Sequence, residues 1–516
     1  MRLLNLGHSE FQGDETRALF FGAGLAQGDS GLFFLHKKGP VEFVIPFGIL
    51  SALGSIDEFS ARFPFALAGI GVVAFIFILC RRAFSPAVAF TAGVFCSLEG
   101  FILAFARIVQ YQSFLLLFAA ASFYCAFRAR TAQAPRPYLY SAAVFLALSL
   151  LSHYDAAIAA VGVLAFFVPG RFKSYLGPAM LVAGIVAAFY IPFFLSSSFS
   201  STAAYLGQRV DISKLPANNL PRYFDVFSFY NSVYFTALVW MPVLAGALKM
   251  IFVWGSSLCG LPPGSARNFA QVERCLALWL TCGLVVMGFC IARPNTHFYV
   301  IHIPLLILSA RALNNGLAGL TKGVVAPVAA LMALLSLPYP WFCYIRSSPE
   351  FRPGYPQTLP AIYPSLGRRQ APGGAFFGFP HVSGWKAIGA LYQQGDLTGS
   401  YSSNEEELIT AWYTRGAERD DSDPDYYFVV TSASDPVKIP MSKIKREYSF
   451  IGRIYLDKRK LLDIFAKAAV NKPVPHQLDQ LAPAFPTHSL PTKQQIRTTL
   501  FPWSIPTKTG VGRKLL

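Results

Sequence analysis

The amino-acid sequence predicts a mainly α-helical protein: a polytopic transmembrane helix bundle with external juxtamembrane helices and a small C-terminal α/β domain. Three observations predict this class. Hydrophobic residues make up 54% of the 516 positions and charged residues only 14%, whereas a soluble domain has about 25% charged residues. The mean hydropathy is +0.43. Several apolar runs reach the roughly 17 to 25 residues that a membrane-spanning helix needs.

The net charge of +17 agrees with a membrane protein, because basic residues retain loops on the cytoplasmic side. No basic stripe interleaved with aromatic residues lies on a soluble stretch, so we expect no nucleic-acid partner. Nearly all of the eight cysteines lie in or beside apolar runs, and no pair has CxxC spacing. We therefore expect packing residues rather than a disulfide framework or a metal site.

About ten apolar segments are predicted to span the membrane, within residues 62–345. Basic clusters occur at every second turn between these segments, starting with Arg81 and Arg82. The positive-inside rule assigns those turns to the cytoplasm, so residues 1–61 and 346–516 are predicted on the other side. The predicted spans are 62–80, 86–106, 113–129, 138–152, 156–169, 175–195, 231–254, 275–292, 297–312 and 323–345.

Residues 1–61 are predicted to form an external loop with juxtamembrane helices. Within it, the apolar stretch 41–57 is interrupted by Pro46 and two glycines. Counting this stretch as a span would invert every later loop. We therefore expect a helix that lies at the membrane interface.

Residues 346–470 are predicted to form an external α/β domain that begins with a Pro/Gly-rich linker. The segments "GWKAIGALYQQG" and "NEEELITAWYTRG" have helical patterns, whereas "GSYSS" and "DYYFVVTS" have strand patterns. In residues 471–516, Pro, Lys, Thr and Gln dominate with little periodicity. This composition predicts a flexible tail.

Charged residues concentrate in the stretch "FQGDETRALFFGAGLAQGDSGLFFLHKKGPVEF", which precedes the first predicted span. Asp14 and Glu15 stand side by side, "GD" follows at 28–29, and "KGP" follows at 38–40. The predicted topology gathers further polar residues at the same membrane face. These are Arg107, Asp155, Arg293 and His297.

This pattern resembles the first external loop of lipid-linked-sugar glycosyltransferases of the C-type superfamily, and most closely the protein O-mannosyltransferase and aminoarabinose transferase branch. That family has an Asp-Glu pair, an amphipathic helix, a Gly-Asp, and a Lys-Pro-Pro motif that leads into an interfacial helix. Asp14 and Glu15 match the acidic pair, and Lys38 matches the motif lysine, with Gly39 in place of the first proline. The later "RPNTHFYVIHIPLLIL" resembles the family's late external motif.

Two departures from the family pattern stand out. The family has a transmembrane helix before the acidic pair, whereas "MRLLNLGHSEF" is too short and too polar to span. We expect that an N-terminal segment is missing from the sequence; the other interpretation is a protein without that helix. Many relatives also have an acidic residue where Gln112 stands. A role that requires a second carboxylate at this position is therefore not expected of this chain.

The resemblance implies transfer of a sugar from a polyprenyl phosphate to an acceptor hydroxyl on the non-cytoplasmic side. Asp14 matches the family's catalytic aspartate, which would accept the proton of the hydroxyl. A helix N-cap is the alternative role for Asp14. Glu15 is a candidate substrate-binding residue, or an acidic residue that complements the helix dipole.

A leaving lipid phosphate needs fixed cations at the membrane face. Lys38 is the first candidate because it matches the motif lysine, whereas Lys37 is expected to snorkel at the interface. Arg62, Arg107 and Arg293 are further substrate-binding candidates, since arginine can bind phosphate through two N–H groups. Anchoring at the interface is their alternative role.

Two residues of the later external turns complete the predicted site. His297 is predicted to hydrogen-bond phosphate or sugar, with a structural role as the alternative. Asp155 is predicted to cap the helix that follows it. We expect no metal and no other cofactor, because the sequence has no HExxH motif and no Cys/His metal spacing. Binding of a divalent cation stays open as the alternative, because some C-type relatives that transfer oligosaccharides use one.

The predicted partners are a lipid-linked sugar donor, an acceptor protein, lipid or glycan, and membrane lipids, in a bacterial plasma membrane. Two other functions compete. A transporter or lipid flippase would carry ionisable residues at mid-membrane and inverted repeats, and the sequence shows neither pattern. A non-catalytic scaffold would leave the Asp-Glu and Lys-Gly-Pro motifs without a purpose.

Overall fold

The computed structural model describes residues 1–167, 172–209, 218–256, 266–319, 322–366, 368–371, 377–456, 458–467 and 491–500. The chain divides into two compact units, each made of three segments. The first unit comprises Met1–Leu4, Phe34–Val41 and Pro64–Phe379. The second unit comprises Asn5–Phe33, Glu42–Phe63 and Pro380–Leu516.

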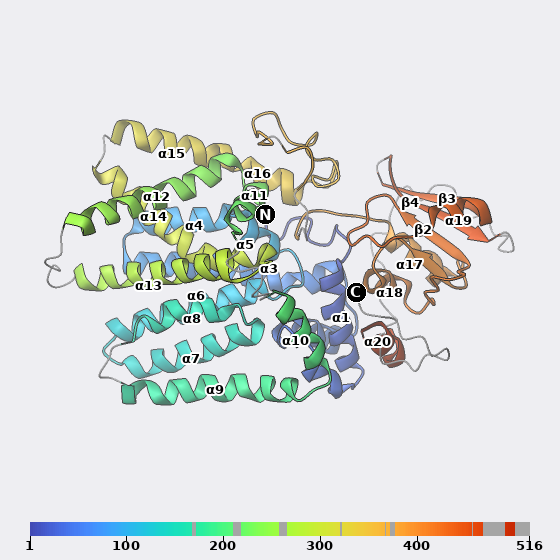
Figure 1. The fold of residues 1–516 in the computed structure, drawn as a ribbon, viewed down its shortest axis with the longest axis horizontal. Helices are drawn as coiled ribbons and strands as arrows, with labels where there is room; N and C mark the ends of the chain where they lie inside the picture. The colour runs from blue at the N-terminus through green and yellow to red at the C-terminus, as the bar shows by residue number, and fades with distance from the viewer. Residues whose placement is uncertain are drawn as a thin grey trace. The chain divides into compact units, whose positions relative to one another are not determined.

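The first unit is a bundle of apolar helices (Figure 1). The long helix α3 (Glu58–Ala83) contributes its beginning to the second unit and the rest to this bundle. The other helices are α4 (Pro86–Leu98), α5 (Gly100–Phe105), α6 (Gln112–Thr131), α7 (Pro135–Ser152), α8 (Ala156–Leu164), α9 (Phe172–Phe194), α10 (Ser198–Arg209), α11 (Leu220–Tyr230), α12 (Val233–Ser256), α13 (Ala266–Val285), α14 (His302–Gly319), α15 (Lys322–Ser336) and α16 (Pro338–Pro340). A 3-10 helix, η4 (Asn295–Ile301), leads into α14.

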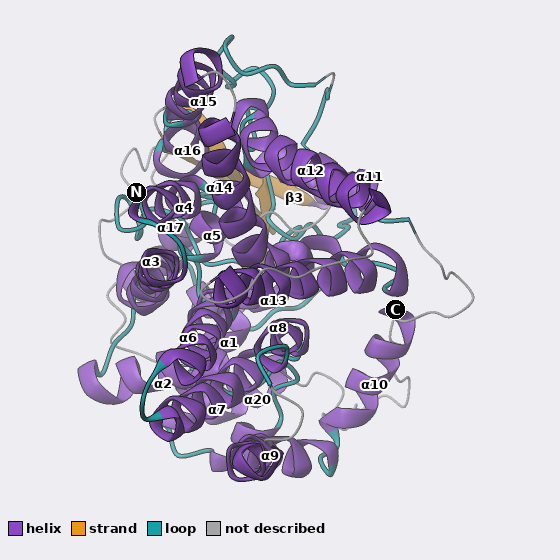
Figure 2. Ribbon diagram, turned by 90° about the vertical axis from the view of Figure 1, so that its left-hand side faces the viewer, coloured by secondary structure: helices purple, strands orange, loops and turns teal. Residues whose placement is uncertain are grey.

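Neighbouring helices of the bundle pack side by side. Helix α7 packs against α6 and α9, α8 packs against α13, and α14 packs against α4, α12 and α13. Figure 2 shows several of these helices end-on. Aromatic rings fill the centre of the bundle: Phe101 stacks on Tyr230 with ring centroids 4.2 Å apart.

Six helices in the described part of the chain are long and apolar enough to cross a membrane. This finding confirms the predicted polytopic class. The six are Glu58–Ala83, Gln112–Thr131, Phe172–Phe194, Gln271–Cys290, Asn295–Gly316 and Pro327–Ile345.

The prediction of a single span over 86–106 is wrong. The chain breaks at Glu99, which lies between α4 and α5. The Glu99 carboxylate accepts hydrogen bonds from the backbone N–H groups of Phe101 and Ile102, at 3.1 and 2.8 Å. A buried acid therefore ends one helix and caps the next, because its charge is satisfied by the free N–H groups of a helix start.

The second unit combines helices with a small sheet. Its strands are β1 (Tyr401–Ser403), β2 (Tyr426–Val430), β3 (Tyr448–Leu456) and β4 (Arg459–Lys467), in the order β1-β2-β4-β3. Strands β1 and β2 are parallel, and the other pairings are antiparallel. The helices are α1 (Gly13–Ala26), α2 (Val41–Leu53), α17 (Trp385–Gln394), α18 (Glu407–Thr414), α19 (Met441–Glu447) and α20 (Lys493–Leu500).

The small C-terminal α/β domain is thereby confirmed. The predicted helices appear as α17 and α18, and the predicted strands appear as β1 and β2. Glycine in the left-handed region borders α17 at both ends, Gly384 with φ +100° and Gly395 with φ +77°. Strands β3 and β4 and helix α19 were not predicted from the sequence.

Helix α20 lies inside the stretch predicted as a flexible tail, so that prediction is wrong for residues 491–500. Two N–H groups of Arg497 donate to the Asp29 carboxylate at 2.6 and 2.7 Å. Ile496 is buried, and the Gln27 side chain donates to the Pro491 carbonyl at 2.5 Å. The rest of the predicted tail, 471–490 and 501–516, lies outside the described residues.

We expect Arg497→Gln to increase hydrogen exchange of the α20 amides by up to about fivefold, because an ion pair whose arginine is exposed to water contributes about 1 kcal/mol or less. Gln494→Ala on the same helix should leave exchange unchanged. The Arg497 guanidinium lowers the pKa of Asp29. The contact should therefore hold at neutral pH and weaken as acid protonates Asp29. Equal exchange in the Arg497 variant and the wild type would contradict this prediction.

Candidate functional site

The motif lysine lies against an aromatic ring in the first unit. Lys38 is half-buried, and its Nζ lies over the Tyr111 ring, 5.3 Å from the centroid. This is the distance of a cation–π contact. Tyr111 in turn stacks on the His153 imidazole, with centroids 4.1 Å apart and planes 9° apart. One ring therefore joins the lysine of the first loop to the turn "SHYD".

Gly39 explains why the motif reads Lys-Gly-Pro here. Its φ is +112°, a region that favours glycine. A Cβ at this position would lie 2.2 Å from the Leu151 carbonyl oxygen. The Gly39 carbonyl is also within hydrogen-bond distance of His36 Nδ1, at 3.1 Å. The backbone that carries Lys38 thus approaches the end of α7 more closely than any side chain would allow.

Restoring the family's proline is expected to harm this protein. Proline fixes φ near −65°, so Gly39→Pro cannot keep the observed backbone and should displace Lys38. We expect a loss of folded protein, read by size-exclusion chromatography. Pro40→Ala serves as the control, because it leaves Gly39 in place. A Gly39→Pro variant that folds normally would contradict this interpretation of the loop.

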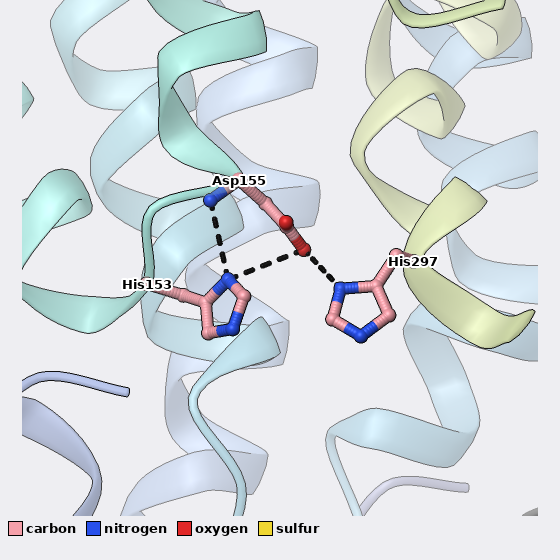
Figure 3. A group of neighbouring side chains, drawn as sticks. All are labelled: His153, Asp155 and His297. Atoms are coloured by element: carbon pink, nitrogen blue, oxygen red, sulfur yellow. Dashed lines mark hydrogen bonds and ion pairs between the residues drawn. The ribbon is translucent and has the colours of Figure 1, made fainter. Parts of the chain in front are cut away.

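Three side chains from separate elements meet beside this stack (Figure 3). His153 follows α7, Asp155 precedes α8, and His297 lies in η4. The Asp155 Oδ2 atom is 2.5 Å from His297 Nδ1 and 3.3 Å from His153 Nδ1. The Tyr299 hydroxyl donates to the same oxygen at 3.1 Å. We call His153, Asp155 and His297 the His-Asp-His cluster.

Burial and charge decide the protonation of this cluster. Burial alone would raise the pKa of the Asp155 carboxyl, but the imidazoles of His153 and His297 outweigh it and hold that pKa well below its usual range. Burial lowers the pKa of His153 to about 4. At neutral pH Asp155 is therefore a buried carboxylate and His153 is neutral.

The predicted cap by Asp155 is wrong. Asp155 stands at the start of α8, but its side chain makes no capping hydrogen bond there. Its carboxylate points instead to His297 and Tyr299. His153 was not predicted as a site residue. A signal for it existed, because it shares the turn "SHYD" with Asp155, and that turn was assigned to the same membrane face as His297.

Arg62 and Glu15 form a buried ion pair in the second unit. Arg62 Nε and Nη2 each donate to the Glu15 carboxylate at 2.8 Å. The other three N–H groups of Arg62 donate to backbone carbonyls, those of Leu6, Ser9 and Glu10. The two side chains are only 2% and 0% exposed.

The predicted phosphate contact of Arg62 is therefore not supported, because all five of its N–H donors are used within the protein. The same holds for a direct substrate contact by Glu15, which also accepts from the Gln12 backbone at 3.0 Å. The pair instead fixes the segment before α1, the helix that carries Asp14.

The other two predicted arginines differ from each other. Arg107 is buried, and its Nη1 donates to the carbonyls of Met1 and Leu4, both at 2.8 Å. These contacts indicate a structural role rather than a phosphate contact. Arg293 is exposed and lies shortly before His297 in the chain. Of the predicted arginines, Arg293 is the one that stays accessible to a ligand.

Asp14 lies in the first turn of α1 and is half-buried. The N-cap of α1 is Gln12, so the capping role considered for Asp14 is wrong. Two further acids approach the same helix start: a Cβ on Gly13 would lie 2.1 Å from Glu406 Oε2 and 3.1 Å from Asp435 Oδ2. Burial raises the pKa of Glu406 to about 7, and the charges of Asp435 and Asp14 add to this rise.

The predicted residues thus separate into two groups. Lys38 and His297 belong to the first unit, where Tyr111, His153 and Asp155 connect them. Asp14 belongs to the second unit, as does the Glu15–Arg62 pair.

A family model supports the assignment made from the motifs. The model described as dolichyl-phosphate-mannose-protein mannosyltransferase matches residues 37–205. This range covers less than half of the chain and includes Lys38, Tyr111, His153 and Asp155. No curated protein gives a significant match.

Solved structures show the same fold. The crystal structure of ArnT from Cupriavidus metallidurans bound to undecaprenyl phosphate has a TM-score of 0.54 and 11% identity, over 92% of this chain and 97% of that chain. Its apo form has a TM-score of 0.51 and 13% identity, over 90% and 95%. The Archaeoglobus fulgidus oligosaccharyltransferase in complex with Zn and sulfate reaches 0.42 and 12%, over 82% and 64%, which is too low to carry an argument.

The two ArnT structures, at these low identities, establish the fold alone. The family model adds sequence similarity over residues 37–205 of this chain. Together with the apolar helices, they support an integral membrane protein of the glycosyltransferase kind. The resemblance inferred from the motifs is therefore confirmed: the chain has the fold of ArnT, and residues 37–205 match the model of the dolichyl-phosphate-mannose-protein mannosyltransferases.

Proposed function

We propose that this protein is a membrane glycosyltransferase that moves a sugar, a hexose or a pentose, from a polyprenyl phosphate to an acceptor hydroxyl. The observation that carries the proposal is the position of Lys38 on Tyr111, beside the His-Asp-His cluster. A fixed cation and two imidazoles there suit the negative charge of a leaving phosphate. The similar fold of ArnT, solved with undecaprenyl phosphate, agrees with this donor class.

The transfer exchanges one bond at the sugar for another. The bond between the anomeric carbon and a phosphate oxygen breaks, and the phosphate keeps the electron pair. The acceptor oxygen bonds to the anomeric carbon, and its proton passes to the Asp14 carboxylate. Lys38 stabilises the phosphate charge. His297, held through Nδ1 by Asp155, presents its other ring nitrogen to phosphate or sugar.

The sidedness and the acceptor are part of this proposal. Basic residues favour the cytoplasm in every second turn, which supports an active site on the non-cytoplasmic side of a bacterial plasma membrane. The acceptor is a hydroxyl of a protein, a lipid or a glycan. The C-terminal α/β domain is proposed to contact that acceptor.

Buried ionisable residues inside the bundle do not favour the transporter alternative. Glu99 and His302 lie within it, with Oε2 and Nδ1 3.2 Å apart. Glu99 also caps α5 and accepts from the Asn231 side chain at 3.0 Å. These contacts give Glu99 a structural role, whereas a transport residue needs access to a cavity.

We expect Lys38→Met to weaken binding of undecaprenyl phosphate by about 10- to 100-fold, because a hydrogen bond to a charged group contributes about 1.5–3 kcal/mol. Lys37→Met is the matched control and should bind as the wild type does. Binding can be measured on the full chain in lipid nanodiscs by competition with a labelled polyprenyl phosphate. Equal affinity of the Lys38 variant and the wild type would overturn the assigned phosphate contact.

A further inference from the structure

We propose that the His-Asp-His cluster is a binding site for a divalent transition-metal ion, with Zn²⁺ as the expected occupant. One ligand atom from each of His153, Asp155 and His297 lies within 4.8 Å of the others. His153 and Asp155 are buried, and the His297 side chain is 11% exposed. A site enclosed in this way keeps bulk water away from the metal while leaving one side accessible.

The ligand set selects the class of metal. Two imidazoles and one carboxylate suit zinc and its first-row neighbours, whereas Mg²⁺ and Ca²⁺ prefer sites made of oxygen atoms. Zinc sites with three protein ligands keep a fourth position for water or substrate. The cluster therefore fits an ion that also contacts an external ligand.

The distances show how the ion would fit. Metal bonds of about 2.0–2.2 Å place neighbouring ligand atoms of a tetrahedral site about 3.3 Å apart. The separation of Asp155 Oδ2 from His153 Nδ1, 3.3 Å, already has this size. The separation from His297 Nδ1, 2.5 Å, is that of a short hydrogen bond. Metal binding would release the proton of this hydrogen bond and open the pair by about 0.8 Å.

Surrounding contacts hold the three ligands in place. The Tyr299 hydroxyl donates to Asp155 at 3.1 Å, the kind of outer contact that orients a metal-binding carboxylate. Tyr111 stacks on His153 and fixes its ring plane. The Asp155 backbone N–H, 3.2 Å from His153 Nδ1, would give up that contact to the ion. The cost is this weak hydrogen bond and the one between Asp155 and His297, against three bonds to the metal.

The ion would also have a role in transfer, and that role rests on the proposed function. Lys38 lies on Tyr111, which stacks on His153. A divalent ion there adds positive charge near the place assigned to the leaving phosphate. Metal binding itself does not depend on this role and can be measured without any transfer assay.

The test uses the full chain in detergent, stripped with a chelator and titrated with Co²⁺ as a spectroscopic probe. Wild type is expected to bind one equivalent, with the visible absorption of tetrahedral cobalt that Zn²⁺ abolishes. Asp155→Asn and His297→Gln should each lose binding by more than 100-fold. Tyr299→Phe should weaken it by about 10- to 100-fold, the usual cost of an outer-shell partner. His8→Gln, a histidine of the second unit, should bind normally.

Two results would overturn the metal site: no stoichiometric binding by folded wild type, or binding that persists in both ligand variants, which means an adventitious ion only. A rise in the wild type's melting temperature with Zn²⁺ gives a second readout if a variant misfolds. A failure of the metal-site proposal can be distinguished from a failure of the proposed function. Asp14→Asn should bind Co²⁺ normally. Transfer by metal-free wild type would overturn the ion's role in transfer and would leave the proposed function standing.

Discussion

Replacing Asp14 by asparagine is expected to lower sugar transfer by about 10²–10⁴-fold, the usual contribution of a general base. Asparagine has nearly the shape of aspartate but cannot accept the proton of the acceptor hydroxyl. Asp14 is half-buried, lies in the first turn of α1 and does not cap it, so the substitution should leave the fold intact. The measurement is single-turnover transfer from a labelled polyprenyl-phosphate sugar by protein in nanodiscs.

Asp57→Asn is the matched control for this experiment. Asp57 lies just before α3 and accepts from the Ser60 backbone N–H at 2.7 Å, a contact that asparagine can also make. Transfer by this variant should equal that of the wild type. Unchanged transfer by the Asp14 variant would contradict its role as the base.

Glu15→Gln is expected to lower the free energy of unfolding by about 3–5 kcal/mol, because it leaves the Arg62 guanidinium buried without its counter-charge. The two side chains are almost fully buried, so water cannot replace the lost partner. Thermal unfolding in detergent should show a melting temperature several degrees lower, and transfer should fall with it because the pair fixes the loop before Asp14.

An exposed pair in the second unit provides the comparison. Arg446 and Glu447 are 72% and 42% exposed, so Glu447→Gln should cost about 1 kcal/mol or less. The double variant Glu15→Gln, Arg62→Met should cost less than the sum of its single variants, since it removes the unpaired charge. A Glu15 variant as stable as the Glu447 variant would show that the buried pair does not hold the loop.

Most of the fold could be predicted because its signals are local. Apolar length predicts the spans, and α17, α18, β1 and β2 have clear periodicity. Strands β3 and β4 lack that signal, because charges interrupt their alternation. Arg453 and Asp463 stand opposite each other on these strands and form an ion pair. The break at Glu99 was not predicted, because a single acid in a long apolar run is compatible with a continuous helix. Only the structure shows that this acid caps a second helix.

The candidate site could be predicted only in part, because its contacts join distant residues. The charge pattern assigned the turns with Asp155 and His297 to one membrane face, and their side chains do meet. The pairing itself links residues 142 positions apart, which no local pattern encodes. For the same reason Arg62 was predicted as a phosphate ligand. The sequence shows that Arg62 is charged. It does not show that the Glu15 carboxylate and three backbone carbonyls accept all of the arginine's hydrogen bonds.

The donor class is tested most directly by reconstituting the full chain in liposomes with a radiolabelled sugar on undecaprenyl phosphate or on a nucleotide. The proposed function predicts that label moves to an acceptor from the lipid-linked sugar and not from the nucleotide sugar. It also predicts that Asp14→Asn and Lys38→Met both lose this transfer. Label that moves from the nucleotide sugar alone, or from the lipid-linked sugar equally well in both variants, would contradict it.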